Sequence, residues 1–419
     1  MIVEFPYKNQ FEPIYIPDDS LIGVFQPHEF DEVEDKIKCI EDSLDNPIGT
    51  GKIEDVAKDA KTAVIISDDY TRQTPVDIII PLIEKRLKLT AVESIKILVA
   101  LGTHRPMTDE EKLEKFGKDI CSRFEIINHS YKDNSQLVDL GTTDGGTHFE
   151  VNKYVYDADF VIGLGQIVPH RICGYSGGAK IILPGVCGAD ATAHTHWIGG
   201  FAPGEEMLGK TDNIVRNEMN KCAQMAGLKY IVNTILDPSG KLIYAVSGDY
   251  ISAHKEGCKL SEKVFGVKVP CKADIVITDS YPKDIELWQA AKAMYAADLM
   301  VKEGGVVILI SPCVEGVSRA HPQILERGYT TEDETMCDLN AGLINRSVAS
   351  HCLRMGRLIK EKARGIMVKN GIPKEDQEKL GFIPAETPQQ ALEIAFELTG
   401  RDSKVAVLKH GGEALPVVG

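Results

Sequence analysis

Residues 63–75 read AVIISDDYTRQTP, a short run of apolar, β-branched side chains that gives way to polar and charged ones. A continuous apolar run of this length is typical of a strand that is buried on both faces, as in a parallel sheet. The helix-like segment Pro75–Leu89 follows directly. Strand, loop and helix in this order predict one unit of an α/β fold with a right-handed crossover.

The same alternation extends over the rest of the chain. Further helices are expected at Asp109–Phe116 and Ile285–Val301. Further strands are expected at Ile95–Leu101, Phe124–Ile127, Phe160–Leu164, Ile275–Ile277, Val306–Ile310, Ile366–Val368 and Val405–Leu408. We therefore predict the α/β class, with largely parallel sheets.

The length of the chain predicts more than one domain, because 419 residues exceed what one ordinary hydrophobic core serves. The short, turn-like segment around Pro270 suggests the boundary. We predict an N-terminal α/β domain over residues 1–270 and a C-terminal α/β domain over residues 271–419. The last residues of the chain could pack back on the N-terminal domain.

Composition narrows the class of protein and of partner. The net charge is −15, from 47 Lys and Arg against 62 Asp and Glu, which argues against a nucleic-acid partner. A locally basic pocket could still bind an anionic substrate. The sequence opens without a basic and apolar leader, no run approaches a membrane span, and the ten cysteines form no C-x-x-C pair. We expect a cytoplasmic protein with reduced thiols and no membrane partner.

Polar residues follow the predicted strands where each strand ends, and open parallel sheets bind ligands at that edge. The loop Asp68–Pro75 follows the first strand. Thr74 as a helix cap, with Pro75 in the first helical position, would explain the Thr-Pro pair alone. It leaves the two aspartates, Thr71 and Arg72 unexplained. We favour an anion or nucleotide contact, because helix N-termini attract anions and Arg72 adds a bidentate donor.

The loop Gly102–Asp109 reads GTHRPMTD and follows the second strand. A lone histidine is usually structural, but His104 lies beside Arg105 at the carboxyl end of a predicted strand. A functional role is therefore favoured for His104. Thr108 and Glu111 match a capping box, which predicts that a helix starts there.

Residues 170–180 read HRICGYSGGAK. Gly177 and Gly178 let the backbone approach a ligand closely, and Lys180 just beyond can be aimed at that ligand. The run is not a P-loop, because the residue before the lysine is not glycine and the residue after it carries no hydroxyl. Nor does GLG at residues 163–165 continue into a dinucleotide-binding motif. A kinase and a dehydrogenase therefore lose support.

His194 and His196 are two residues apart, a spacing that suits a strand or loop, where both side chains point the same way, but not one face of a helix. Either imidazole could bind nickel, copper or zinc, although a single histidine is more often structural.

Gln289 and Lys292 lie three residues apart in a predicted helix, beside Trp288, so they share a helix face. A solvated face and a carboxylate clamp supplied by the second domain both remain open.

Together these segments resemble the nickel-dependent lactate racemase family over most of the chain. The resemblance rests on the DDxTRxTP and GTHRPMT loops, on H-x9-K-x15-H from His170 through Lys180 to His196, and on Gln289-x-x-Lys292. It implies a two-domain α/β enzyme with its active site in the cleft between the domains. It also implies a nickel-pincer cofactor, a pyridinium mononucleotide with thioamide and thiocarboxylate groups, which separate biosynthesis proteins make.

The resemblance implies a role for each matching residue. Lys180 corresponds to the lysine that can be joined covalently to the cofactor, and His196 to the nickel ligand. His104 and His170 correspond to the paired acid/base residues. Further cofactor contacts are expected from Asp69, Thr71, Arg72, Ser176, Gly177 and Gly178, and substrate contacts from Arg72, Trp288, Gln289 and Lys292. We further expect the Trp288 ring to tune which acid fits.

The implied reaction is the inversion of a small 2-hydroxy acid such as lactate. Its carbon has no adjacent ketone and is too weakly acidic for a side-chain base. Loss of hydride is easier: a base takes the hydroxyl proton while a cofactor takes hydride. The flat 2-keto acid that results can receive hydride on either face. Two bases are then needed, one for each enantiomer, and two histidines meet that need.

Two other classes of function remain open from the residues alone. A zinc-dependent hydrolase would use His104, His170 and His196 around the metal. A non-catalytic carrier would bind nickel or its organic ligand without turnover. The Asp68–Pro75 loop and the lysine after a double-glycine turn favour the racemase, because neither alternative needs them.

Overall fold

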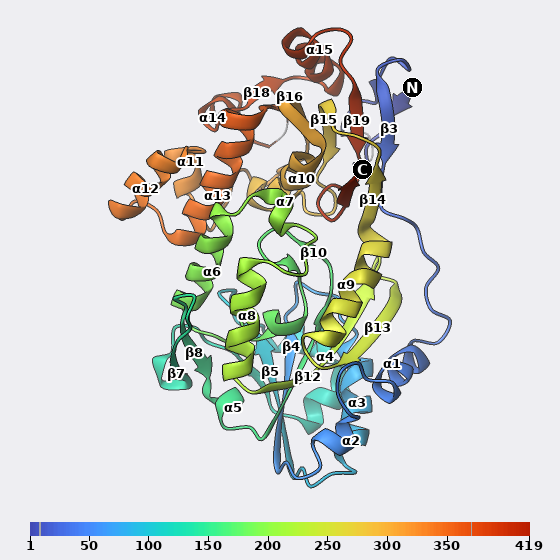
Figure 1. The fold of residues 1–419 in the computed structure, drawn as a ribbon, viewed down its shortest axis with the longest axis vertical. Coiled ribbons are helices and arrows are strands. Elements are labelled where there is room, and N and C mark those ends of the chain that lie inside the picture. Colours follow the sequence, from blue (N-terminus) through green and yellow to red (C-terminus); the bar gives the residue numbers. More distant parts are fainter. Residues whose placement is uncertain (8–9, 370) are drawn as a thin grey trace. The chain divides into compact units, whose positions relative to one another are not determined.

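The computed structural model describes residues 1–7, 10–369 and 371–419 (Figure 1). The chain divides into two compact units. The N-terminal unit comprises Glu29–Thr195 and Lys210–Lys263, and the C-terminal unit comprises Met1–His28, His196–Gly209 and Val264–Gly419. Each unit contains one large sheet with helices packed against it, so the predicted α/β class is confirmed.

The sheet of the N-terminal unit has the strand order β13-β12-β9-β4-β5-β6, in which all neighbours are parallel except β12 and β13. The strands are β4 (Thr62–Asp68), β5 (Ser94–Ala100), β6 (Ile126–Asn128), β9 (Phe160–Gln166), β12 (Leu228–Leu236) and β13 (Leu242–Gly248). The first four confirm predicted strands. The last two were not predicted, because β12 carries the polar residues Asn233 and Thr234 in a buried stretch.

Helices and short strand pairs complete this unit. The helices are α1 (Lys36–Asp45), α2 (Ile53–Val56), α3 (Val76–Leu87), α4 (Asp109–Arg123), α5 (Lys153–Tyr156) and α8 (Ile214–Met225), with 3-10 turns at Asn134–Gln136 and Gly178–Ile181. The antiparallel pairs are β7 (Leu137–Thr142) with β8 (His148–Asn152), and β10 (Pro169–His170) with β11 (Gly174–Tyr175). Helices α6 (Ala189–Phe201) and α9 (Ser252–Phe265) begin in this unit and end in the other.

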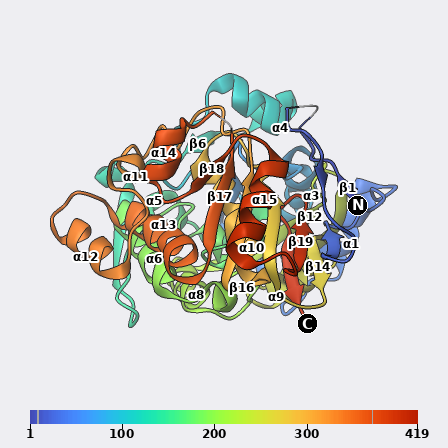
Figure 2. The same cartoon turned by 90° about the horizontal axis from the view of Figure 1, so that it is seen from above.

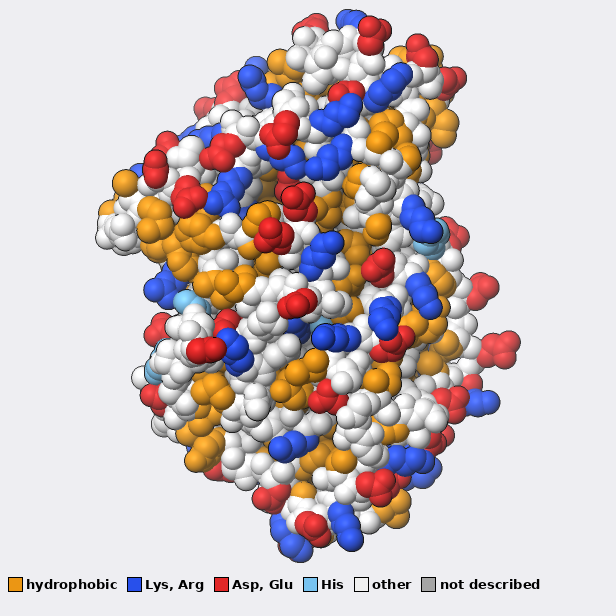
Figure 3. All heavy atoms as spheres, viewed as in Figure 1, with side chains coloured by type: hydrophobic (Ala, Val, Ile, Leu, Met, Phe, Trp, Pro, Cys, Tyr) orange, Lys and Arg blue, Asp and Glu red, His pale blue; other side chains and the backbone are white. Residues whose placement is uncertain are grey.

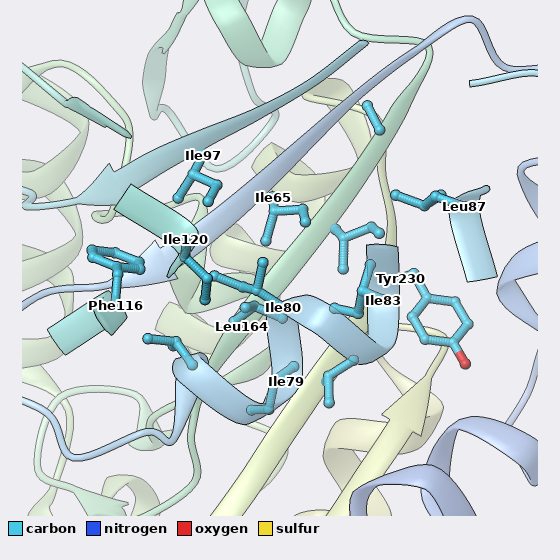
Figure 4. Close-up of a cluster of buried hydrophobic side chains, with 14 of the residues drawn as sticks. Ile65, Ile79, Ile80, Ile83, Leu87, Ile97, Phe116, Ile120, Leu164 and Tyr230 are labelled. Atoms are coloured by element: carbon cyan, nitrogen blue, oxygen red, sulfur yellow. The ribbon is translucent and has the colours of Figure 1, made fainter. Parts of the chain in front are cut away.

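The core of the N-terminal unit is rich in isoleucine (Figure 4). Ile80 and Ile83 of α3 and Phe116 of α4 are buried in one cluster with Ile65 and Ile97 of the sheet. Each side chain of this size contributes about 1.5–3 kcal/mol when it is fully buried. This core holds the strands whose carboxyl ends carry the site loops.

The sheet of the C-terminal unit has the order β18-β17-β16-β15-β19-β3, and every neighbouring pair is parallel. Figure 2 shows β16, β17 and β18 side by side. The strands are β3 (Leu21–Phe25), β15 (Ala273–Asp279), β16 (Val301–Ile310), β17 (Arg364–Val368), β18 (Ile383–Ala385) and β19 (Val405–Leu408). The four strands predicted for this part of the chain are therefore confirmed.

The remaining elements of this unit are short strands and helices. The strand pairs are β1 (Ile2–Val3) with β2 (Ile14–Tyr15), and β14 (Gly266–Val269) with β20 (Leu415–Val418). The helices are α7 (Gly204–Met207), α10 (Leu287–Met300), α11 (Gln323–Arg327), α12 (Glu332–Asn340), α13 (Arg346–Gly356), α14 (Lys374–Lys379) and α15 (Pro388–Thr399), with a π-helix at Arg357–Lys362. Helix α10 packs on β15 and β16, and α15 on β16 and β17.

The compact units differ from the predicted division at residue 270. Met1–His28 belongs to the C-terminal unit, because β3 adds to the edge of that sheet beside β19. The end of the chain stays in the same unit, since β20 pairs with β14. Pairing between distant segments leaves no local signal in the sequence, which is why the place of Met1–His28 was not predicted.

None of the helices among the described residues is both long and apolar enough to span a membrane. The ten cysteines are free thiols, and six of them are buried.

Candidate active site

The loop after β4 begins with two aspartates that have different partners. Asp68 Oδ1 lies 2.9 Å from Lys115 Nζ of α4, and Asp68 Oδ2 accepts a 2.5 Å hydrogen bond from Thr74 Oγ1. Helix α3 starts at Val76 without a side-chain cap, so the alternative interpretation of Thr74 as a helix cap does not hold. The hydroxyl is engaged by the carboxylate of Asp68 instead. Thr108, by contrast, forms the predicted capping box with Glu111 at the start of α4.

Asp69 is buried and bonded to His104. Its Oδ2 lies 2.6 Å from His104 Nδ1, and its Oδ1 accepts hydrogen bonds from the backbone N–H (3.0 Å) and hydroxyl (2.5 Å) of Thr71. Burial alone would raise the pKa of Asp69, but the hydrogen bonds from His104 and Thr71 outweigh it and lower that pKa. The ionised carboxylate only accepts, so Nδ1 of His104 carries the proton and Nε2 is the basic nitrogen.

His170 and Lys180 form a second pair. Lys180 Nζ lies 3.2 Å from His170 Nε2, while His170 Nδ1 accepts the backbone N–H of Ile172 at 3.2 Å. The thiol of Cys173 lies 3.4 Å from the same Nδ1. A neutral imidazole that accepts at Nδ1 carries its proton on Nε2, and Nε2–H then points at the lysine amine.

The surroundings of Lys180 lower the pKa of its amine. Burial lowers the pKa of Lys180, and the positive charges of Arg72, Arg216 and Arg171 lower it further, against an opposite effect of Cys173. An uncharged amine can accept the Nε2–H of His170 and is nucleophilic. Arg72 is thus close enough to Lys180 to affect its pKa. The Arg72 guanidinium itself donates hydrogen bonds to the carbonyl and hydroxyl of Thr71.

The double-glycine turn is shaped by packing inside the protein. Gly177 and Gly178 both have positive φ, of 72° and 58°. A Cβ at Gly177 would lie 2.7 Å from Asn233 Oδ1, and one at Gly178 would lie 2.7 Å from His254 Cγ. The backbone N–H of Gly178 donates to Asn233 Oδ1 at 2.8 Å. The close approach that the sequence suggested for a ligand is made here to the protein's own side chains.

Further polar contacts hold the same turn. Ser176 Oγ accepts from the backbone N–H of Val168 and donates to the carbonyl of Gln166, at 2.9 and 2.6 Å. The buried Arg216 of α8 donates to the carbonyls of Gly177 and Tyr175. Sequence reasoning missed Asn233, Arg216 and His254, because each is a single polar residue in its own element with no motif around it.

His194 and His196 lie in helix α6, so the predicted strand or loop is wrong. The segment is rich in alanine, and Asp190 stands in the first turn, where a negative charge stabilises a helix. Two residues along a helix turn the side chain by about 200°, so the two imidazoles face different sides. His194 Nε2 lies 3.2 Å from the carbonyl of Gly145. No group of three or more His, Cys, Asp or Glu that could hold a metal occurs among the described residues.

The predicted substrate residues lie at the start of α10 in the C-terminal unit. Lys292 Nζ donates to Gln289 Oε1 at 2.9 Å, so the expected shared face is confirmed. The Trp288 ring lies between the rings of His321 and His351, each 4.5 Å from it between centroids. His351 is buried and its Nδ1 lies 2.9 Å from the hydroxyl of Tyr295. The indole therefore packs against two histidine rings that no sequence motif predicted.

The predicted residues of the N-terminal unit come from loops at one edge of its sheet. β4, β5 and β9 are neighbours in one parallel sheet, so the loops after them share an edge. The predicted residues of the N-terminal unit are Asp69, Thr71, Arg72, His104, His170, Ser176, Gly177, Gly178 and Lys180. Those of the C-terminal unit are His196, Trp288, Gln289 and Lys292. The placement of the active site in a cleft between domains remains a prediction.

Comparison with known proteins identifies the family of this chain. The family model "Lactate racemase N-terminal domain" matches residues 7–232, and the model "Lactate racemase C-terminal domain" matches residues 268–415. The lactate racemase of Lactiplantibacillus plantarum is 35% identical over 322 residues, which cover 75% of each chain. The lactate racemase of Thermoanaerobacterium thermosaccharolyticum is 30% identical over 433 residues, covering 98% of this chain and 97% of the relative.

Solved structures extend the comparison to the fold. The lactate racemase apoprotein from T. thermosaccharolyticum superposes with a TM-score of 0.89 at 28% identity and covers 100% of both chains. A protein from Thermotoga maritima shares the fold, with a TM-score of 0.69 at 20% identity, over 93% of this chain and 100% of that one. Two matched domains and two relatives of at least 30% identity lead to one conclusion: the chain belongs to the lactate racemase family and is an isomerase of the racemase type.

Proposed function

We propose that this racemase inverts lactate or a related 2-hydroxy acid, with a nickel-pincer pyridinium nucleotide as cofactor and with His104 and His170 as alternating acid and base. The observation that carries the proposal is the 3.2 Å contact between Lys180 Nζ and His170 Nε2. It joins the lysine expected to hold the cofactor to one of the two expected bases. The names of the curated relatives support lactate as the substrate.

The residues around Lys180 fit such a cofactor. Lys180 is half-buried and its pKa is lowered, a direction that favours bonding of its amine to a thioacid-derived carbon. Arg72, Arg171 and Arg216 add positive charge that suits the phosphate of a nucleotide. His196 would hold the nickel. When bound, the group supplies the hydride acceptor and donor that no side chain provides.

His104 is arranged to take a proton. Asp69 holds the proton on Nδ1, which leaves Nε2 of His104 as the base for the substrate hydroxyl. The imidazolium that forms is stabilised by the ionised carboxylate 2.6 Å away. The same pairing fixes the orientation of the ring. Asp69 is therefore a positioning residue for this base.

His170 is the second proton carrier of the proposal. Its Nδ1 accepts the N–H of Ile172, so the proton of the neutral ring lies on Nε2. A histidine gives a proton to the substrate oxygen only as the imidazolium, because the neutral ring does not lose its remaining proton. In the proposed cycle one histidine starts neutral and takes the hydroxyl proton, while the other starts as the imidazolium and returns a proton, so the opposite direction starts with the two states exchanged.

The C-terminal unit supplies contacts to the substrate in this proposal. Gln289 and Lys292 would bind its carboxylate, with Arg72 from the other unit. The ring of Trp288 would bound the space for the substituent on carbon 2. Apart from Arg72, these roles put substrate binding in the C-terminal unit and proton transfer in the N-terminal unit.

Protein produced together with the cofactor-biosynthesis proteins tests the proposal. We expect nickel in the sample, racemisation of lactate or a related acid, and a mass increase equal to the cofactor that is absent in Lys180→Ala. Zinc-dependent hydrolysis without any adduct would favour the hydrolase. Stoichiometric nickel binding with no turnover of any 2-hydroxy acid would favour the carrier.

A further inference from the structure

The last turn of helix α6 is bonded to two arginines of the C-terminal unit. Arg354 Nη1 donates to the carbonyl of Gly199 at 3.2 Å, and Arg357 Nη1 donates to the carbonyl of Phe201 at 2.9 Å. The last four carbonyls of a helix have no partner inside it, so these guanidinium groups serve as its C-terminal cap. Their charge also complements the negative end of the helix dipole.

Both arginines are held in place by further contacts. Arg354 is buried, and its guanidinium carbon lies 5.3 Å from the centre of the Tyr295 ring. Arg357 Nη2 donates to Glu332 Oε2 at 2.6 Å, and its guanidinium carbon lies 5.8 Å from the centre of the Phe201 ring. Each arginine has several partners. If either one moved, it would lose these other contacts as well as its hydrogen bond to α6.

Small residues let the helix approach closely. A Cβ at Gly200 would lie 2.6 Å from Ser350 Oγ and 2.9 Å from Ser350 Cα of α13. Gly204, the first residue of α7, leaves room for Arg354: a Cβ there would lie 2.7 Å from Asp298 Oδ2 and 3.2 Å from Arg354 Nη2. A larger side chain at Gly200 would push α6 away from α13, and one at Gly204 would displace Asp298 or Arg354.

The π-helix Arg357–Lys362 supplies the second arginine. It continues α13 directly, and π-helical turns are rare and frequently occur at functional sites. Lys362 Nζ fastens its far end to the carbonyl (2.6 Å) and Oδ1 (2.7 Å) of Asp298. Beside these residues a cavity of about 410 Å³ has both basic and acidic side chains in its wall. Figure 3 shows the same intermingling of charges on the face it views.

We propose that Arg354 and Arg357 form a clamp on α6 that sets the position of His196. The proposal rests on the proposed function, in which His196 holds the nickel. Gly199 and Phe201 are two residues apart, so their carbonyls are about 200° apart around the helix axis and fix its rotation. His196 lies within about one and a half turns of both, on the same rigid segment. Arg354 and Arg357 are therefore positioning residues, which act on the metal ligand through the backbone.

Nickel retention by the holoenzyme tests the clamp. Arg357→Gln should release nickel about tenfold faster than the wild type on dialysis against a chelator, in the range seen for residues that orient metal ligands. Arg357→Lys should fall between the two, because an ammonium cannot reach Phe201 and Glu332 with one planar group. Lys360→Gln is the matched control, since Lys360 is exposed on the same π-helix and should retain nickel as the wild type does.

Hydrogen exchange of the cofactor-free protein gives a readout independent of nickel. Arg357→Gln should speed exchange of the amides of residues 198–204 by about tenfold, while Lys360→Gln should not. Arg354→Gln should act in the same direction, provided that thermal unfolding shows a folded protein. Nickel retention and exchange in Arg357→Gln equal to those in Lys360→Gln would overturn the clamp alone. Full nickel retention by His196→Ala would overturn both the proposed ligand and the clamp's purpose.

Discussion

Two buried aspartates at corresponding places in the two units differ in ionisation. Asp69 follows β4 in the N-terminal unit, and Asp279 ends β15 in the C-terminal unit. Asp69 is bonded to His104 and Thr71, which lower its pKa. Asp279 accepts from the backbone N–H of Tyr281 and of His410, and burial raises its pKa to about 7.

The contrast shows that the neighbours of a strand end, rather than the topology, decide what its carboxylate does. Both units present an aspartate at the carboxyl edge of a parallel sheet. In the N-terminal unit an imidazole lies 2.6 Å from it, so a charged carboxylate is maintained beside a base. In the C-terminal unit the carboxyl group has main-chain donors and serves the local fold. The comparison therefore favours proton transfer in the N-terminal unit.

The largest expected effect separates the two aspartates by activity. Asp69→Asn should lower the racemisation rate by about 10²–10⁴-fold, because the base loses the charge that stabilises its protonated form. Asp279→Asn should racemise at a rate near that of the wild type at pH 7. Initial rates on matched, cofactor-loaded samples measure both. Equal losses in the two variants would remove the distinction between the units.

A second effect separates them by the pH dependence of stability. The pKa of Asp279 is about 7 in the folded chain against an ordinary 3.8, so its contribution to stability is present below about pH 4 and lost as pH rises towards 7. The loss amounts to at most about 4 kcal/mol. Asp279→Asn should flatten this decline in unfolding experiments between pH 4 and 8.

The contribution of Asp69 to stability depends on pH in the opposite direction. Because its folded pKa is lowered, its contribution is present above the ordinary pKa and lost as pH falls through the folded value. Asp69→Asn should therefore change stability in acid, where the wild-type carboxylate becomes protonated. A flattened slope in this variant, with none in Asp279→Asn, would reverse the assignment.

A third effect tests the division between binding and proton transfer. Trp288→Ala should change the relative kcat/KM for bulky and small 2-hydroxy acids by about tenfold or more, because the ring no longer bounds the substituent. Asp69→Asn should lower the rates of all these acids by a similar factor. Unchanged relative rates in Trp288→Ala would show that the indole does not select the substrate.

The smallest expected effect concerns the loop that carries Asp69. Thr74→Val removes the donor to Asp68 Oδ2 and should destabilise the protein by about 1–3 kcal/mol. Thr74→Ser keeps the hydroxyl and is the control. A loss of stability shared by both variants would mean that the methyl group, rather than the hydrogen bond, matters at this position.

Much of the fold could be predicted because its strands correspond to local patterns in the sequence. Buried parallel strands appear as apolar runs, and all eight predicted runs are strands. The residues after those runs fall at the carboxyl edge of a sheet, so the sequence alone is enough to single out His104. Its partner Asp69 lies in the other loop motif, DDxTRxTP, and was assigned to the site by the resemblance.

The rest depends on contacts between distant segments. β3 joins the sheet of the C-terminal unit only through β19, about 380 residues away in the chain. Thr74 donates to the carboxylate of Asp68 instead of capping helix α3. His194 and His196 lie in a helix, which the spacing of the two histidines alone did not reveal. Arg216, Asn233 and His254 support the glycine turn from three separate elements.

The central claim is that His104 and His170 serve opposite enantiomers, and a single-turnover experiment tests it most directly. Cofactor-loaded His104→Ala and His170→Ala are each mixed with D- or L-lactate, and the 2-keto acid formed is measured after quenching. We predict that each variant yields keto acid from one enantiomer only, and that the two variants accept opposite ones. Equal yields from both enantiomers in both variants would contradict the account.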